Sequence, residues 1–139
     1  MGTDADQAHV NKYQASIGKA ASAGPLEFQQ WFCKSSSLEE TRIRGYWDFA
    51  VHILTPAVVA EISRPQEKTV LEIGYGGGRI LNAACAFFGH AIGVDIHNET
   101  QTFIEHKNVT LLVGDGQTLP VKDASVDFVY SFIVFLHLQ

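Results

Sequence analysis

The residues best suited to chemistry in this sequence form a glycine-rich run behind a short apolar segment. Residues 70–73 include Glu72 and are followed by glycines at positions 74, 76, 77 and 78, and a helical pattern begins at Arg79. Glycine is needed where the backbone takes a positive φ or approaches a ligand more closely than a Cβ permits. The first amides of the helix have no partner inside it. The order strand, tight turn, helix therefore predicts a cradle for a nucleotide or an amino acid.

Two aspartates follow later apolar segments and could complete such a cradle. Asp95 lies 19 residues after Gly76, and its carboxylate could accept hydrogen bonds from both hydroxyls of a ribose. Asp115 lies between two glycines, where it could accept from an exocyclic amine while a neighbouring amide donates to a ring nitrogen. Each has a plainer interpretation: Asp95 as a helix N-terminal or solvated turn residue, and Asp115 as an Asx turn.

The elements that would position these residues alternate between strand and helix. We expect strands at 69–73, 91–95, 109–113 and 126–135, and helices at 79–88 and 98–106. Strands this apolar are typical of a parallel sheet covered on both faces, with right-handed crossovers. The pattern predicts an α/β fold with a Rossmann-like, doubly wound, mostly parallel sheet of about four strands. In such sheets a ligand binds beyond the carboxyl ends of the strands.

The N-terminal third has a different character. Residues 1–24 carry no sustained period, and we expect a mobile tail; residues 25–65 form a helical cap, and residues 66–139 form the nucleotide-binding half-domain. Pro25 suits a first helical turn. Ser37 begins a capping box for a second helix, and Gly45 is a plausible stop for it. Tyr46 and Trp47 could close over the ligand, although core packing is the plainer interpretation.

Composition excludes several classes of protein. The chain has 139 residues, a formal net charge of −5 and no cluster of lysine or arginine, which argues against a nucleic-acid partner. No apolar run reaches the roughly 18 residues of a membrane span, and the acidic, polar start is not typical of a secretory signal. Cys33 and Cys85 are far apart in apolar surroundings, which favours reduced thiols in a cytoplasmic protein. No His, Cys, Asp or Glu spacing indicates a metal site.

Four segments together resemble a known family. Residues 72–78, 93–95, 114–120 and 126–129 are similar, in order and spacing, to four consecutive motifs of the class I S-adenosylmethionine-dependent methyltransferases. The joint match extends over about residues 65–138 and is more specific than any one motif. A dinucleotide fingerprint, G-x-G-x-x-G, would instead need a glycine at position 79, where Arg79 stands.

The resemblance implies a site for S-adenosyl-L-methionine, with S-adenosyl-L-homocysteine as the product. The glycine loop would lie under the methionine part and the ribose, while Glu72 would order the loop and meet the ammonium group. Asp95 would hold the ribose diol, Ile96 would pack on the adenine and Asp115 would bind the adenine amine. The implied cofactor-binding residues are Glu72, Gly74, Tyr75, Gly76, Gly78, Asp95, Ile96, Asp115, Gly116, Ser131 and Phe132.

The leading functional hypothesis is therefore methyl transfer to an unknown acceptor, which we expect to be a small molecule. His137 resembles a histidine that follows strand four in many small-molecule methyltransferases and is a weak candidate for catalysis; a structural role is the plainer interpretation. Two alternatives stay open. One is a nicotinamide-dependent oxidoreductase, which Asp95 would also suit, and the other is a non-catalytic cofactor-binding or assembly module.

The resemblance also raises a question about the fourth strand. The family fold has seven strands in the order 3-2-1-4-5-7-6, and this sequence ends just after strand four. We expect either a truncated chain or a surface completed by another chain. Strand four would then lie at an edge of the sheet, where unpaired amides and carbonyls can pair with another strand. We expect a homodimer through the edge at Val126–Leu136.

Overall fold

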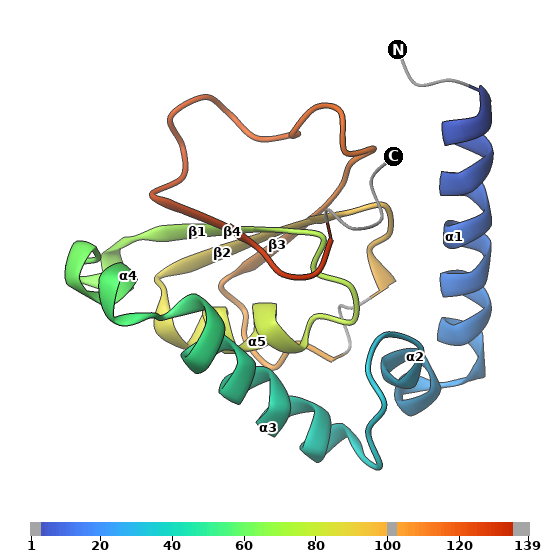
Figure 1. Ribbon diagram of the computed structural model, residues 1–139, viewed down its shortest axis with the longest axis horizontal. Helices are drawn as coiled ribbons and strands as arrows, with labels where there is room; N and C mark the ends of the chain where they lie inside the picture. Colours follow the sequence, from blue (N-terminus) through green and yellow to red (C-terminus); the bar gives the residue numbers. More distant parts are fainter. Residues whose placement is uncertain (1–3, 100–102, 135–139) are drawn as a thin grey trace.

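A parallel four-stranded sheet forms the centre of the molecule (Figure 1). The computed structural model describes residues 4–99 and 103–134. The strands are β1 (Thr69–Ile73), β2 (His90–Asp95), β3 (Val109–Val113) and β4 (Phe128–Ser131), in the order β3-β2-β1-β4. All three pairings are parallel. This order is the one expected for the first four strands of the family fold.

The register of the sheet brings the carboxyl ends of its strands together. Ile73 pairs with Val94 of β2 and with Ser131 of β4, and Asp95 pairs with Val113 of β3. The carboxyl ends of all four strands therefore meet at one edge, where loops from several strands can surround a ligand. Central strand β1 has three consecutive buried residues, as expected for a strand covered on both faces.

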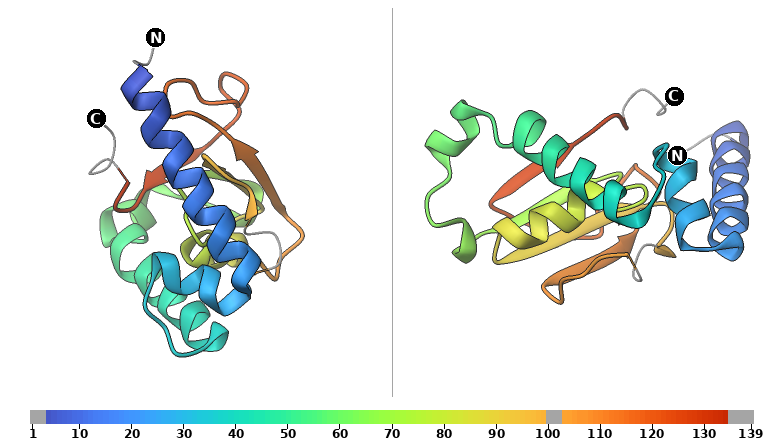
Figure 2. Two further views of the ribbon diagram at one scale, coloured as in Figure 1. Left: turned by 90° about the vertical axis from the view of Figure 1, so that its right-hand side faces the viewer. Right: turned by 90° about the horizontal axis from the view of Figure 1, so that it is seen from below.

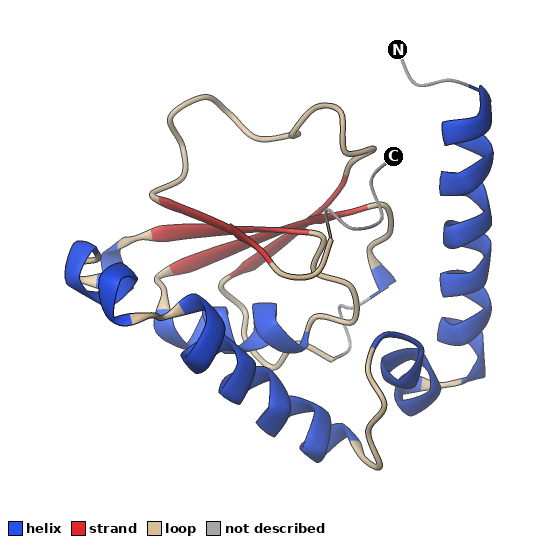
Figure 3. Ribbon diagram, viewed as in Figure 1, coloured by secondary structure: helices blue, strands red, loops and turns tan. Residues whose placement is uncertain are grey.

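Helices α3 (Leu38–Asp48) and α5 (Arg79–Phe87) lie on one side of the sheet, and α4 (Pro56–Glu61) lies near the start of β1 (Figures 1 and 3). The Ser37 hydroxyl accepts from the Glu40 amide, which confirms the predicted helix start. Gly45 is not the predicted stop, because α3 continues through it into the π-helix η1 (Phe49–Ile53). A Cβ on Gly45 would lie 2.1 Å from the Arg79 carbonyl oxygen, so this glycine permits close packing of α3 on α5.

Most of the segment that we expected as a mobile tail is helical in the described residues. It contains a 20-residue helix, α1 (Asp4–Ala23), followed by α2 (Pro25–Phe32), which begins at the predicted proline. Helix α1 runs beside the end of the sheet, and α2 lies between α1 and the glycine loop (Figure 2). Ile17 is buried and the Tyr13 ring packs edge-on against Trp31, so contacts with other elements hold α1 in place.

Of the predicted helix at 98–106, Glu99 has a 3₁₀ conformation, whereas residues 103–106 are not helical. Residues 103–106 form a turn and an irregular segment after the undescribed residues 100–102. The Phe103 carbonyl accepts from the Arg42 guanidinium, and the Glu105 amide donates to the Asn82 side chain. Backbone groups that a helix would pair internally are therefore satisfied by side chains of α3 and α5.

The fourth strand is shorter than predicted, with four residues instead of the expected segment 126–135. Its partner β1 ends at Ile73, which pairs with Ser131, so the ladder runs out there. Ile133 then has a φ of 56°, which ends the extended conformation. The polypeptide from 114 to 127 runs over the side of the sheet opposite α5 (Figure 1). The last part of the expected edge, residues 135 and 136, lies outside the described residues.

Two further predictions can be compared with the structure. In the described part of the chain, no helix has the length and apolar character needed to cross a membrane. Cys33 and Cys85 are both free and buried, as predicted. Burial raises the pKa of the Cys85 thiol to about 12, which keeps it protonated and unreactive at neutral pH.

Candidate functional site at the strand ends

A cavity of about 610 Å³ lies where the carboxyl ends of the strands meet α1 and α2. This volume is within the usual range for small-molecule sites. The sheet contributes Glu72 and Asp95, the glycine loop contributes positions 74–77, and the two N-terminal helices supply an aromatic wall. The cavity therefore lies between the two parts of the chain that the sequence analysis treated separately.

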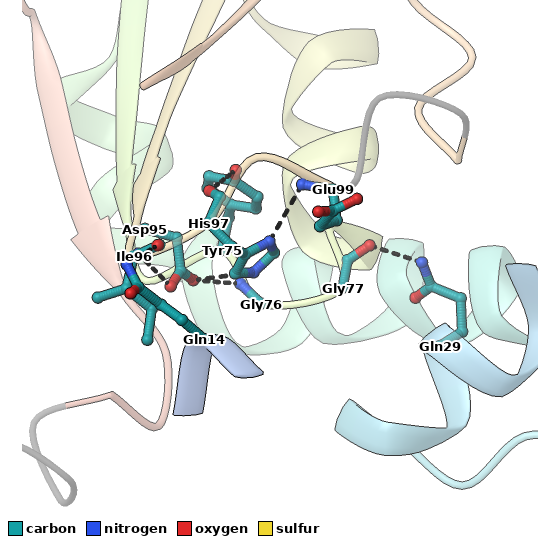
Figure 4. Close-up of polar contacts among 9 residues, drawn as sticks. All are labelled: Gln14, Gln29, Tyr75, Gly76, Gly77, Asp95, Ile96, His97 and Glu99. Carbon is teal, nitrogen blue, oxygen red and sulfur yellow. Dashed lines mark hydrogen bonds and ion pairs between the residues drawn. The ribbon is translucent and has the colours of Figure 1, made fainter. Parts of the chain in front are cut away.

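The glycine loop and Asp95 are joined directly, as Figure 4 shows. The Asp95 carboxylate accepts from the Gly76 amide at 2.8 Å and from the Ile96 amide at 2.7 Å. A carboxylate can accept about four hydrogen bonds, so both oxygens retain capacity for further donors. Residues 19 positions apart thus form one unit at the cavity, which suits recognition of a diol.

The loop glycines are approached by other side chains of this chain. Gly76 has a φ of 56°, and a Cβ there would lie 3.0 Å from the Phe32 ring. A Cβ on Gly77 would lie 2.5 Å from Oε1 of Gln29, and one on Gly74 would lie 2.2 Å from a methyl group of Val134. The space that a Cβ would need at these glycines is taken by α2 and by the segment after β4, while the expected contact of the loop with a ligand stays a prediction.

Glu72 is a buried carboxyl at the base of the cavity. It is 2 % exposed and accepts from the Tyr130 hydroxyl at 2.8 Å. Burial raises the pKa of Glu72 to about 8, with the Tyr130 hydrogen bond and the charge of Arg79 opposing the rise. The Arg79 guanidinium is itself paired with Asp48 at 2.8 Å. Glu72 is therefore mostly neutral at pH 7 and would ionise beside a bound cation.

Tyr75 and Ile96 both border the cavity and also make contacts within the chain. Tyr75 is 4 % exposed and its hydroxyl donates to the His97 carbonyl at 2.6 Å, so its ring packs inward although the residue borders the cavity. Ile96 borders the cavity as expected, and its carbonyl accepts from the Gln14 side chain of α1 at 2.9 Å. Burial lowers the pKa of the His97 imidazole, which the nearby Asp95 opposes.

Asp115 and Gly116 border the cavity and also form the turn that was the plainer interpretation. The Asp115 carboxylate accepts from the Gln117 amide at 2.9 Å and from the Thr118 amide at 3.4 Å. Both bonds use the same oxygen, Oδ1. They lower the pKa of Asp115, so the group is an anion at neutral pH. An Asx turn and a cavity-lining role are therefore compatible here.

Of the remaining predicted site residues, some border the cavity and others do not. Phe132 borders the cavity, whereas Ser131 donates its hydroxyl to the Ile73 carbonyl at 3.0 Å and Gly78 caps α5; neither of these two lines it. Tyr46 and Trp47 do not close over the site: the Tyr46 hydroxyl points to His106 at 3.5 Å, and Trp47 is 61 % exposed. His137 lies outside the described residues.

Sequence analysis missed the aromatic wall of α1 and α2. His9, Tyr13, Trp31 and Phe32 all border the cavity. The ring centroids of Tyr13 and Trp31 are 5.9 Å apart and those of Trp31 and Phe32 are 4.8 Å apart, so the rings form a continuous surface. The spacing of His9, Tyr13 and Ile17 at every fourth residue was the available signal for this face of α1.

The chemistry of the lining favours an organic ligand that carries positive charge and hydroxyl groups. Three carboxyl residues of the described chain border the cavity, and the arginine beside them, Arg79, is neutralised by Asp48. Aromatic faces attract cations. Among the described residues, no group of three or more His, Cys, Asp or Glu could hold a metal ion. The parallel sheet with a cavity at its strand ends defines a Rossmann-like α/β protein.

Comparisons with known proteins agree with this class. Residues 71–139 match the family model described as a methyltransferase domain. Phosphoethanolamine N-methyltransferase 1 of Triticum aestivum is 33 % identical over 92 residues, which cover 60 % of this chain and 18 % of that protein. The chain thus spans less than a fifth of this curated relative.

Two solved structures are similar in fold to this chain. One is phosphoethanolamine N-methyltransferase 1 of Haemonchus contortus in complex with phosphoethanolamine and S-adenosylhomocysteine; its TM-score is 0.62 at 14 % identity, covering 96 % of this chain and 27 % of that one. The other, described as a methyltransferase, is from a complex with the Haloferax volcanii Trm112 methyltransferase activator; its TM-score is 0.50 at 29 % identity, covering 68 % and 42 %. Residues 71–139 are thus similar to a methyltransferase domain, and the likeness to the Haemonchus contortus structure is one of fold.

Proposed function

We propose that this chain binds S-adenosylmethionine at the strand-end cavity and serves as the cofactor-binding part of a methyltransferase. The single observation that carries the proposal is the hydrogen bond from the Gly76 amide of the glycine loop to the Asp95 carboxylate, at a cavity bordered by three carboxyl residues. The family match to residues 71–139 supports it.

The residues present fit this cofactor. Its ribose offers two hydroxyl donors, and the Asp95 carboxylate has acceptor capacity beyond its bonds to Gly76 and Ile96. Its ammonium and sulfonium groups are cationic, which suits Glu72, the aromatic wall and the neutralised Arg79. Asp115 and the Gly116 amide lie at the rim, where an adenine amine and a ring nitrogen would need them.

When bound, the cofactor supplies a sulfonium methyl group for in-line transfer to a nucleophile. The protein's own contribution is positioning, which can supply much of the rate of such a reaction. Asp95 would hold the ribose, and Glu72 would give up its proton to become the counterion of the ammonium group. The aromatic rings of α1 and α2 would exclude water from one side of the cavity.

An amine on a small molecule is the acceptor that we propose. Two relatives named phosphoethanolamine N-methyltransferase support this choice, one by sequence and the other by fold. A neutral amine is already nucleophilic, and a general base is needed only for a protonated acceptor.

The decisive experiment is calorimetric titration of the purified chain with S-adenosylhomocysteine, with NADH as the parallel ligand. We expect binding of S-adenosylhomocysteine and none of NADH. Binding of NADH alone would favour the nicotinamide-dependent alternative. Transfer of a labelled methyl group from S-adenosylmethionine to a panel of small amines then separates an enzyme from a non-catalytic binding module.

A further inference from the structure

We propose that Gln29 of α2 is a positioning residue of the cofactor site, which holds the glycine loop in its binding conformation. The ligand in this inference is the one assigned under the proposed function, and the inference rests on it. Figure 4 shows the contact: the Gln29 side-chain amide points at the Gly77 carbonyl, on the side of the loop away from Asp95.

The contact between Gln29 and the loop is buried and well formed. Nε2 of Gln29 donates to the Gly77 carbonyl oxygen at 2.7 Å, across 48 residues of sequence. Gln29 is 1 % exposed, in a helix whose other polar residues are exposed. Removing the donor would leave a buried acceptor without a partner, which is costly.

Packing shows that the loop is shaped to receive α2. A side chain on Gly77 would collide with Oε1 of Gln29, and one on Gly76 would press on the Phe32 ring. Phe32 in turn stacks on His97, with ring centroids 5.6 Å apart. Gln29 and Phe32 therefore reach the loop together, one through a hydrogen bond and the other through its ring.

The orientation of the Gly77 carbonyl also determines the orientation of the Gly78 amide. The peptide unit that links Gly77 and Gly78 is planar, so this carbonyl and the Gly78 amide lie in one plane and point in opposite directions. The Gly78 amide donates to the Tyr75 carbonyl at 2.9 Å, which closes the turn, and the Gly78 carbonyl accepts from the Asn82 amide at 2.8 Å. Gln29 thus orients the plane that links the tight turn to the first turn of α5.

The same turn presents the Gly76 amide to Asp95. Gly76 precedes the plane held by Gln29 and donates to the Asp95 carboxylate, which is the proposed ribose ligand. A loop that rotates about Gly77 would move this amide and free the carboxylate to turn. Gln29 therefore acts on the ligand through the loop and Asp95, without a contact of its own being required.

The test compares Gln29→Met with Gln30→Met. Both replace a glutamine of α2 by an apolar residue of similar length, but Gln30 is exposed and donates only to the nearby Ser35 carbonyl among the contacts described. We expect Gln29→Met to weaken S-adenosylhomocysteine binding by roughly tenfold or more, and Gln30→Met to leave it within about twofold of wild type. Calorimetry measures both.

A second readout separates positioning from general stability. Hydrogen exchange followed by mass spectrometry should show faster exchange at 74–80 in ligand-free Gln29→Met, with unchanged exchange in β3. Equal affinity and equal loop protection in Gln29→Met and wild type would overturn the proposal. Faster exchange spread evenly over the sheet would also overturn it, because the role would then be structural only.

The two proposals fail in different ways. If the wild-type chain does not bind S-adenosylhomocysteine, the proposed function fails, while the exchange measurement still tests whether Gln29 orders the loop. If Gln29→Met does not fold, Gln29→Asn serves instead, because its amide is one methylene shorter and falls short of the carbonyl. Wild-type affinity in a folded Gln29→Asn variant would refute the positioning role.

Discussion

Asp95 and Glu72 are two carboxyl residues at the base of one cavity, and they differ in their hydrogen bonds and in how easily they ionise. Asp95 accepts two backbone amides and so orders the loop around itself. Glu72 has a single described hydrogen bond, from Tyr130, and is too deeply buried to keep its charge easily. Asp95 is therefore suited to accept hydrogen bonds from hydroxyl groups, while Glu72 can ionise when a cation binds beside it.

The first prediction concerns Asp95. Asp95→Ala should weaken S-adenosylhomocysteine binding by about 1.5–3 kcal/mol, the range for hydrogen bonds to charged groups. Asp127→Ala is the matched control, because Asp127 also accepts a backbone amide, from Thr69, but at the other end of β1. Calorimetry should detect the loss in the first variant only. Unchanged affinity in Asp95→Ala would remove the ribose assignment.

The second prediction follows from the raised pKa of Glu72. Between its ordinary value of 4.5 and about 8 the folded state keeps a proton that the unfolded state has lost. Unfolding then releases a proton, so this group makes stability fall as pH rises through that window, by at most about 1.4 kcal/mol per pH unit. Glu72→Gln, which stays neutral, should show a weaker fall than wild type.

Urea unfolding of the two proteins at several pH values between about 5 and 8, inside that window, measures the difference. Glu39→Gln is the control, because Glu39 is an exposed carboxylate in the first turn of α3, and it should leave the pH dependence as in wild type. The same pH dependence in wild type and Glu72→Gln would show that Glu72 is not the buried acid described here.

At the scale of elements, local sequence predicted the strands better than it predicted what covers them. Strands at 69–73 and 109–113 were found where expected, because each is an apolar run bounded by polar or turn residues. Helix α1 was not predicted, because its only fully buried side chain is Ile17 and its inward face includes polar rings. The position of α1 depends on its contacts with α2 and with residues around the cavity, and a local sequence pattern does not show such contacts.

The site shows the same division. The sequence brought Asp95 and the glycine loop into one hypothesis, since both follow strands of one parallel sheet. It could not reveal that Gln29 packs on the loop, because Gln29 lies 48 residues upstream of Gly77, in a segment without a motif. Nor could it reveal that Tyr75 turns inward, since that depends on the His97 carbonyl.

The third prediction tests the loop as an element. Gly76→Val should abolish S-adenosylhomocysteine binding and lower the unfolding temperature, because φ is 56° and the new side chain would press on Phe32. Gly18→Ala in α1 is the control, since a Cβ there meets nothing within 4 Å, and it should be neutral or stabilising. Thermal unfolding with and without ligand measures both. Wild-type affinity in a folded Gly76→Val variant would show that the loop is only a turn.

At the scale of the whole molecule, the N-terminal helices and the sheet together line one cavity. The family match begins at residue 71, yet the aromatic wall of the cavity comes from α1 and α2. The Haemonchus contortus enzyme matches 96 % of this chain, so its likeness in fold extends beyond the sheet. At β4 the described sheet has an edge, because the one strand that pairs with β4 there is β1.

The last prediction concerns that edge. We propose that β4 pairs with its own copy across a two-fold axis, because an unpaired strand edge can template another strand and a two-fold contact is self-limiting. The described strand is only Phe128–Ser131, shorter than the expected Val126–Leu136, so the contact offers fewer hydrogen bonds. Phe128 also contributes less than expected, because it stacks on Phe88 of its own chain. We therefore expect a dimer that dissociates on dilution.

Light scattering across a range of micromolar concentrations should show a mass rising from that of the 15.3 kDa monomer toward twice that value. Val129→Lys should abolish the rise, because it places a charge on an exposed position of β4, which would meet its copy near the two-fold axis. Val113→Lys makes the same change at an exposed position of β3, the other edge, and should leave the rise intact. A monomer mass throughout, or a dimer lost only in Val113→Lys, would exclude the β4 interface.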